Sequence, residues 1–331
     1  MKQNVDDIRR IKTDKLSDQG FEFLADGEFS KALEIAAKLE ALCYTGAFEL
    51  GALAHYELGE LDEAISYLKK GVSLAPKCWL IWQLLGNYLS DAELYEEAFT
   101  AYDESLLCPD VWRSSVCLNQ AILSNRCGHY AEALEFLSGC IDPELLLHRS
   151  EVEVFALVAL ERFAEADELA RSVLNSWVSP DGHKPDADQC ELLGRIAASL
   201  GRVCLAQNEE VGEIRELALQ YLYLDPTSQS LLALLREIDS QVSRQSHCYA
   251  ITVSCKLPEI NNKYHGVVGY IVNYQVVADN EGEALRYIRR IEEPGLQANI
   301  LAEHVDILQA EPDELKGVYC RSSRIYYERE D

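Results

Sequence analysis

The chain has 331 residues, of which 56 are acidic and 30 basic, so its formal net charge at pH 7 is −26. Hydrophobic residues make up 48% of it, which is enough for a packed core and excludes an acidic disordered chain. The charge argues against direct binding to nucleic acid or to anionic membrane surfaces, because both require an excess of Lys and Arg.

The first residues are expected to form a short lead-in, residues 1–13, before the folded part begins. Met1 is followed by a polar and charged stretch rather than by an apolar signal region, and no run approaches the roughly 20 apolar residues of a membrane span. The eleven cysteines are scattered and include no C-x-x-C pair. We therefore expect a cytoplasmic protein with free, packed thiols.

Residues 14–226 carry an internal repeat. Alanines recur with spacings of 32, 34, 35 and 33 residues, and a bulky residue stands three positions before each alanine. The alanines are Ala32, Ala64, Ala98, Ala133 and Ala166, and the bulky residues are Phe29, Leu61, Tyr95, Tyr130 and Phe163. Glycine precedes three of these segments, at Gly27, Gly59 and Gly128. The pattern predicts stacked helical hairpins in which each alanine opens the packed face of a second helix.

The clearest repeat runs from Trp82 to Pro109. Trp82 is followed by Leu85-Gly86, and the second half contains Ala98 and, four residues later, Tyr102. This resembles the tetratricopeptide signature W-x2-L-G-x2-Y, A-x3-F, P. In such a hairpin the glycine and the alanine occupy the close contact between helices, and the proline ends the second helix. The resemblance covers about residues 14–245 and implies an α-solenoid of about six helical hairpins.

The array becomes irregular toward its end. The fifth first helix, near residues 151–160, lacks a Leu-Gly pair, and residues 179–186 form a proline-containing insert. In the sixth unit, Leu200-Gly201 resembles a helix end, and a loop is expected near residues 207–212. Residues 227–245 then predict a capping helix with Thr227 as its N-cap and one apolar stripe.

Residues 246–331 change from a helical period to alternation. Strands are predicted near residues 249–257 and 269–277, a helix after Asn280, a third strand at residues 300–308 and a fourth at residues 317–327. The fourth strand is either continuous or broken into a hairpin at Ser322-Ser323. The predicted fold class is therefore mainly α, with a small C-terminal α+β domain of order β-β-α-β-β and an antiparallel sheet. This domain resembles no family that we recognise.

Patterns that carry catalysis or bind cofactors are missing from the sequence. It contains no phosphate-binding P-loop, no dinucleotide-binding glycine motif, no H-E-x-x-H and no G-x-S-x-G. His247, Cys248, Cys255 and His265 match no zinc module, and alternation places the two cysteines on opposite strand faces. We expect no metal, no cofactor and no catalytic residue, although catalysis by the C-terminal domain stays open.

Two features of the C-terminal domain have both a structural and a functional interpretation. Arg286, Arg289 and Arg290, joined by Arg321 and Arg324 if the last strand lies nearby, predict a basic edge. Such an edge either solvates an exposed helix face, which we favour, or docks an acidic surface. Tyrosines near the C-terminus suit either a strand or an interface.

The repeat resemblance also implies where a partner binds. In the family, first helices line the concave surface, and transferring that register gives a groove of mixed acidic, amide and apolar residues. These are Glu49, Leu53, Tyr56, Glu57, Leu80, Gln83, Asn87, Asp91, Leu118, Ile122, Asn125, Arg126, Glu151 and Phe155. Glu49 and Gln83 stand where receptors of chaperone tails have cations, so that role is disfavoured.

The sequence thus favours a protein-binding module, an adaptor or a cognate neutraliser or chaperone, that holds a basic and apolar partner segment in the groove. An alternative makes the C-terminal domain a small-ligand or catalytic module whose substrate the repeats recruit. Self-assembly through the sheet edge or the tyrosines is a third hypothesis, and the oligomeric state stays open.

Overall fold

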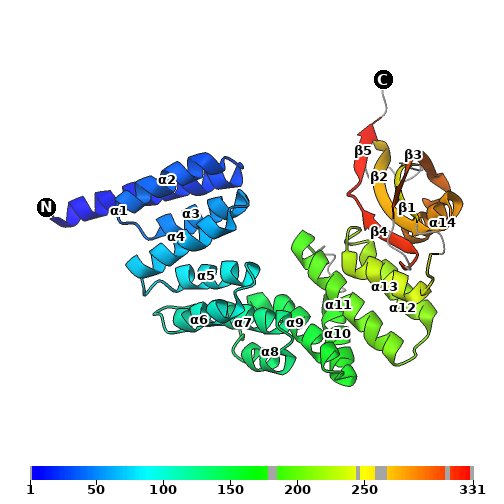
Figure 1. Ribbon diagram of the computed structural model, residues 1–331, viewed down its shortest axis with the longest axis horizontal. Helices are drawn as coiled ribbons and strands as arrows, with labels where there is room; N and C mark the ends of the chain where they lie inside the picture. The colour runs from blue at the N-terminus through cyan, green and yellow to red at the C-terminus, as the bar shows by residue number, and fades with distance from the viewer. Residues whose placement is uncertain (1, 178–184, 244–246, 258–266, 310–313, 329–331) are drawn as a thin grey trace. The chain divides into compact units, whose positions relative to one another are not determined.

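The computed structural model describes residues 2–177, 185–243, 247–257, 267–309 and 314–328 (Figure 1). The chain divides into two compact units, residues 1–149 and residues 150–331, and the division falls within helix α9, Leu146–Ala159. Each unit is described by itself. The insert predicted at residues 179–186 lies almost wholly outside the described residues.

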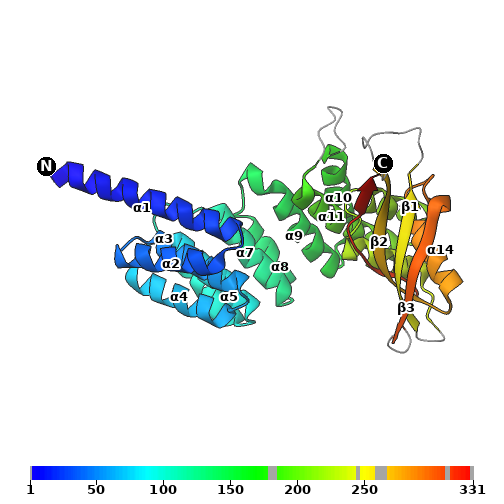
Figure 2. The ribbon, with the colours of Figure 1, turned by 90° about the horizontal axis from the view of Figure 1, so that it is seen from above.

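The first unit consists of antiparallel helices that pack in chain order. Its long first helix, α1, runs through Lys2–Ala25, so the lead-in predicted for residues 1–13 is helical from Lys2 and continuous with the repeats. Figure 2 shows α1 lying along the hairpin that follows it, and it packs on both α2 and α3. The remaining helices are α2 (Phe29–Ala41), α3 (Gly46–Glu57), α4 (Leu61–Leu74), α5 (Trp79–Asp91), α6 (Tyr95–Leu106), α7 (Arg113–Arg126) and α8 (Tyr130–Leu137).

The repeat index read from the sequence is confirmed residue by residue. Every second helix begins at the bulky residue that precedes its alanine, namely Phe29, Leu61, Tyr95, Tyr130 and Phe163. The five alanines are all 0% exposed. A side chain that is only a methyl group lets neighbouring helices approach closely, as the stacking of successive repeats requires.

Gly86 shows why the motif needs glycine in a first helix. A Cβ atom built on Gly86 would lie 2.5 Å from a ring carbon of Tyr102, which belongs to the paired second helix. Gly51 makes the equivalent approach to Tyr67, at 2.3 Å. In both hairpins the tyrosine ring therefore occupies the space that any other residue would need for its side chain.

The turns inside the hairpins require a left-handed backbone. Gly27, Gly59 and Gly128 have φ angles of 75°, 76° and 76°. In the two repeats without glycine the same position holds Glu93 and Glu161, with φ of 61° and 56°. These two glutamates adopt a conformation that costs an L-residue about 1–2 kcal/mol.

The second unit starts with helices that complete the repeats. They are most of α9, α10 (Phe163–Trp177), α11 (Ala187–Ala206), α12 (Val211–Leu222) and α13 (Gln229–Asp239). Gly201, predicted near a helix end, lies inside α11, where its Cβ would approach Leu234 Cδ2 to 2.4 Å. The loop predicted to reach Gly212 ends earlier, because α12 begins at Val211.

Helix α13 lies where the capping helix is predicted, but it is shorter than the predicted residues 227–245. Its N-cap is Ser228, not Thr227, whose hydroxyl instead donates to Asp225 Oδ1 at 2.8 Å. The helix ends at Asp239, where Ser240 takes a left-handed conformation with φ of 47°. The chain then extends, and Val242 pairs with Leu315 as an isolated bridge.

The C-terminal sheet is antiparallel, with strand order β3-β1-β2-β4 and with β5 also paired to β2. Its strands are β1 (His247–Lys256), β2 (Val267–Ala278), β3 (Ile300–Gln309), β4 (Gly317–Arg321) and β5 (Ile325–Glu328). Helix α14, Glu281–Ile291, covers one face of it (Figure 2). The break predicted at Ser322-Ser323 is present, but it makes no hairpin. Strands β4 and β5 pair with successive parts of β2 and so behave as one interrupted strand.

The capping helix and the sheet pack together within this unit. Helix α13 contacts β4, where Arg236 donates from Nη1 to the carbonyl of Val318 and lies 3.9 Å from the centre of the Tyr319 ring. Gly317 is required here, since a Cβ on it would lie 2.8 Å from Arg236 Cγ. The backbone N–H of Lys316 donates to the carbonyl of Gln241 at 2.6 Å.

Candidate functional site

The first helices α3, α5 and α7 lie side by side in the first unit and share a surface, here called the first-helix face. Its centre is an aromatic pair: the rings of Tyr56 on α3 and Tyr88 on α5 stack with centroids 4.6 Å apart and planes 5° apart. Tyr88 is buried, whereas Tyr56 is 40% exposed. The outer ring thus presents a flat aromatic surface to solvent, held rigidly from behind.

Carboxylates surround this aromatic pair. The Tyr56 hydroxyl donates to Asp91 at 3.1 Å, and this carboxylate raises the pKa of Tyr56. Burial is the main reason for the raised pKa of Tyr88, and the charges of Tyr56, Glu57, Asp91 and Glu49 raise it further. Burial also raises the pKa of Glu49. Three acidic side chains therefore act on one stacked pair.

One cation partly offsets these charges. Arg126 on α7 donates from Nη1 to Ser90 at 2.8 Å and to Asp91 at 3.1 Å, and both members of the Arg126–Asp91 pair are about 40% exposed. An ion pair with that exposure contributes little, roughly 0–1 kcal/mol. A cation of a partner could replace Arg126 beside Asp91 at low cost in free energy, so Asp91 remains able to pair with a partner's Lys or Arg.

Amide side chains link neighbouring repeats below this surface. Asn87 Oδ1 accepts from Tyr102 at 2.8 Å and from Asn119 at 2.9 Å, and Gln83 donates to Ser115 at 2.8 Å. These bonds join α5 to α6 and α7. Two of the amides predicted to contact a partner, Gln83 and Asn87, are therefore engaged in bonds between helices.

Exposure separates the predicted groove residues of the first unit into three groups: buried, exposed and half-buried. Gln83 and Leu118 are buried, at 8% and 5% exposure, so a partner on this surface does not reach their side chains. Tyr56, Glu57, Asp91, Ile122 and Arg126 are exposed, and the rest are half-buried. The half-buried members are Glu49, Leu53, Leu80, Asn87 and Asn125. The accessible surface is thus one aromatic ring, one isoleucine and a mixed set of charges.

Similarity to known proteins is visible in the structure only. No family model and no curated protein sequence matches this chain. A solved structure of PilW, a type IV pilus biogenesis factor, is 17% identical, with 67% of this chain and 98% of that chain covered and a TM-score of 0.54. A structure of Pseudomonas aeruginosa PilF is also 17% identical, covering 69% and 99%, with a TM-score of 0.53. The repeats have the tetratricopeptide fold.

A further solved structure is matched over less than half of its own length. The Cut9–Hcn1 hetero-tetramer is 14% identical over 68% of this chain and 42% of that chain, with a TM-score of 0.52. Tetratricopeptide folds generally serve as protein-interaction modules. At 14–17% identity these structures share a fold with this chain, and no residue role carries over.

Two predicted site residues, Glu151 and Phe155, lie on α9 in the second unit of the chain. Phe155 is 47% exposed, and burial raises the pKa of Glu151, an effect that the charge of Arg195 opposes. Phe155 is thus on the solvent side of α9, whereas Glu151 is half-buried.

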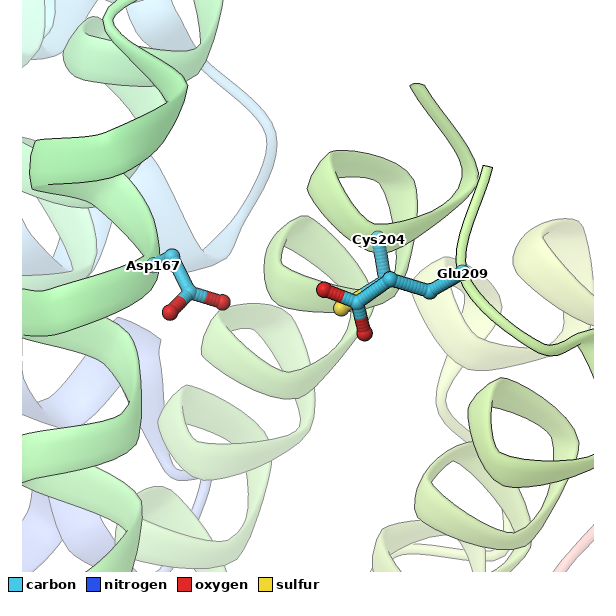
Figure 3. Close-up of side chains that lie close together, drawn as sticks. All are labelled: Asp167, Cys204 and Glu209. Carbon is cyan, nitrogen blue, oxygen red and sulfur yellow. The ribbon is translucent and has the colours of Figure 1, made fainter. Parts of the chain in front are cut away.

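A cluster in the second unit, Asp167, Cys204 and Glu209, has ligand atoms within 4.8 Å of one another (Figure 3). Arg171 already supplies a cation to it. Its guanidinium donates to Asp167 at 2.8 Å, to Cys204 Sγ at 3.4 Å and to Glu209 at 3.5 Å. Burial raises the pKa of Cys204 to about 11, so the sulfur is a neutral thiol at pH 7 and a poor metal ligand.

The sequence missed a buried polar network in the C-terminal sheet. Glu292, 1% exposed, accepts from Arg321 Nη2 at 2.6 Å, from Arg324 Nη2 at 2.9 Å and from the hydroxyls of Tyr270 and Tyr274. Arg321 and Arg324 therefore do not extend a basic edge, and Arg321 is only 4% exposed. A charged residue directly after the apolar stripe of α14 was the one available signal, because Glu292 follows Ile291.

The structure of β1 also bears on the metal site considered for Cys248, Cys255 and His265. Cys255 is buried on the face of β1 opposite to Cys248, and His265 lies outside the described residues, so the metal interpretation gains no support.

In the described part of the chain no helix is both long and apolar enough to cross a bilayer.

Proposed function

We propose that this protein is a non-enzymatic adaptor or cognate chaperone whose first-helix face binds a basic and apolar segment of a partner protein, in the cytoplasm. The observation that carries the proposal is the exposed Tyr56 ring on Tyr88, flanked by Glu49, Glu57 and Asp91 and opposed by the cation of Arg126.

Each feature of this surface has a counterpart in such a segment. A lysine or arginine of the partner can lie over the Tyr56 ring, a cation–π contact worth about 0.5–2 kcal/mol, while a carboxylate pairs with its charge. Ile122, 40% exposed on α7, offers an apolar contact two repeats further along from Tyr56. A net charge of −26 adds a long-range field that increases the association rate with a basic partner.

Binding of a designed peptide tests this surface directly. The probe is a fluorescein-labelled ten-residue peptide of alternating lysine and leucine, with a glutamate and leucine peptide as its control. Fluorescence anisotropy is expected to show binding of the lysine peptide alone, and its affinity should fall as salt rises, because salt screens the exposed charges.

A matched pair of double variants localises the effect. Glu57→Gln with Asp91→Asn removes two charges from the face, whereas Asp62→Asn with Glu63→Gln removes two from the exposed side of the second helix α4. The first pair should weaken binding about tenfold, equivalent to about 1.4 kcal/mol, and the second about twofold or less. Equal weakening by both would mean that only the overall field acts, and the face assignment would be wrong.

The partner itself can be captured through the same surface. A photo-crosslinking amino acid at position 122 should trap a protein that the same group at position 107 does not, since Leu107 is 79% exposed beyond the end of α6. Capture of one protein from both positions with equal yield would contradict the proposal.

A further inference from the structure

Strand β3 forms one edge of the C-terminal sheet. Among the residues that the structure describes, β1 is the one strand that pairs with it. Every second residue of an edge strand directs its backbone N–H and C=O away from the sheet, where they can pair with a further strand. All residues from Leu301 to Leu308 are exposed except Val305, which is half-buried. The edge is therefore open to solvent along most of its length.

A bulge divides β3 into two stretches. The pairing with β1 shifts between Thr252 and Val253, and Glu303 is the extra residue on β3. The carboxylate of Glu303 accepts a hydrogen bond from the hydroxyl of Ser254 on β1. Regular pairing then runs along residues 304–309. An added strand can follow that longer stretch, because a bulge disrupts pairing only locally.

The longer stretch has an apolar side and a charged side. Val305 and Ile307 lie opposite buried residues of β1, so they point to the side of the sheet that α14 covers. Helix α14 packs mainly on β2 and β4, and Ile307 remains 63% exposed. The side chains of His304 and Asp306 point to the other side, lie 3.0 Å apart and are 68% and 63% exposed. Each side of this edge thus has its own chemistry.

We propose that β3 binds an extended segment of a partner protein, with alternating aliphatic and basic residues, as an added strand. Side chains of a strand alternate between its two sides, so one set would lie beside Val305 and Ile307 and the other beside Asp306. Aliphatic residues in the first set would cover Ile307. A lysine or arginine in the second set would pair with the carboxylate of Asp306 across the strands. Backbone hydrogen bonds supply the affinity in this kind of recognition, and the side chains supply its specificity.

Charge favours a basic partner over a second copy of this chain. Strand β3 contains Glu303 and Asp306 but no Lys or Arg, and residues 246–331 hold nine Lys and Arg against fourteen Asp and Glu. Two copies joined along β3 would bring their carboxylates together, and like charges on neighbouring strands destabilise a sheet. A basic strand meets no such repulsion. The edge uses no residue of the first-helix face, so this inference does not depend on the proposed function.

Hydrogen exchange of the full chain, read by mass spectrometry, tests strand addition at the residues concerned. The probe is an eight-residue peptide of alternating lysine and valine. Its control alternates lysine and proline, which keeps the charge but removes every second N–H donor. With a Kd of about 100 µM, about 1 mM of the lysine–valine peptide should slow exchange in residues 300–309 about tenfold. The control peptide should slow it less than about twofold.

Two isoleucines of the same sheet provide matched variants. Ile307 on β3 and Ile325 on β5 are 63% and 64% exposed, so a lysine at either position leaves the core intact and adds the same charge. Ile307→Lys should weaken binding of the lysine–valine peptide about fivefold or more, because a lysine on an edge repels a basic strand. Ile325→Lys should weaken it less than about twofold. Asp306→Asn removes the pairing carboxylate and should weaken it about threefold.

The outcomes separate this edge from its alternatives. Unchanged exchange in residues 300–309 with the lysine–valine peptide, or equal slowing by the lysine–proline peptide, would overturn the proposal. So would equal weakening by the two lysine variants. A wild-type dimer in sedimentation velocity that Ile307→Lys dissociates and Ile325→Lys preserves would assign the edge to a second copy instead.

The exchange data also keep the two binding surfaces apart. Peptide bound to the first-helix face slows exchange in α3 and α5, and this effect should weaken in Glu57→Gln with Asp91→Asn. Slower exchange in residues 300–309 should persist in that double variant. Either proposal can therefore fail alone.

Discussion

Replacing Glu292 by glutamine is expected to loosen the C-terminal sheet strongly, and this change is the most direct test of the energetic argument. The glutamine side chain would keep the shape and one oxygen of the carboxylate. It would lose the negative charge that now faces two guanidiniums and would place an amide NH₂ against one of them. The tyrosine hydroxyls could still donate to the remaining oxygen.

The magnitude follows from burial. Glu292 is 1% exposed and Arg321 is 4% exposed, so neither charge is compensated by water when its partner is removed. Breaking a buried ion pair in this way costs about 3–5 kcal/mol. We take about 3 kcal/mol, since the amide retains part of the hydrogen bonding, and this corresponds to a change of about 150-fold in a local opening equilibrium.

Hydrogen exchange read by mass spectrometry measures the local opening. The chain has two compact units, so a single global unfolding free energy is not defined, whereas amide exchange reports each segment. Peptides from β2 and α14 should exchange about 100-fold faster in Glu292→Gln. The control Glu293→Gln, at a half-exposed ion pair, should change exchange by less than about fivefold. Equal protection of β2 in the wild type and in Glu292→Gln would refute the reasoning.

Acidity gives the same test a second readout. Burial alone would raise the pKa of Glu292, but the charge of Arg321 and the bond from Tyr274 outweigh it, and the pKa lies below its ordinary value of 4.5. A carboxyl whose folded pKa is depressed stabilises the fold above its unfolded pKa and loses that contribution as pH falls through the folded pKa. Protection of β2 in the wild type should therefore drop below about pH 4.5. In Glu292→Gln it should depend less on pH.

Three further predictions concern the repeats. Gly86→Ala should destabilise the first unit by about 1–3 kcal/mol, because its methyl group would overlap the Tyr102 ring. Amide exchange in α5 and α6 should become faster, and unchanged exchange there would contradict the overlap. Glu161→Gly should stabilise the α9–α10 hairpin by about 0.5–1 kcal/mol, because glycine adopts the left-handed backbone at φ of 56° without strain. Amide exchange in α9 and α10 should become slower, and faster exchange would contradict this prediction. Cys204, buried with a pKa of about 11, should resist iodoacetamide at pH 7.5 while exposed Cys43 reacts, and equal labelling rates would contradict the burial of Cys204.

Local patterns determined most of the architecture. The helix starts at Tyr95 and Phe163, the buried alanines and the alternation of β1 all follow from backbone periods of 3.6 and 2, which are properties of a few consecutive residues. The register also predicts groove positions; Tyr56 and Ile122 are exposed on first helices, and their role in binding a partner stays a prediction.

Tertiary structure decided which of these residues are accessible. Gln83 fits a groove position in the sequence, yet it is buried because Ser115, 32 residues later, accepts its amide hydrogen bond. Arg321 has the sequence context of a surface charge, yet a glutamate 29 residues earlier draws it into the core. Local composition records the helical and strand periods, but it does not record which distant charge or ring a folded chain brings alongside. Burial and pKa depend on those distant partners, so only the folded arrangement determines them.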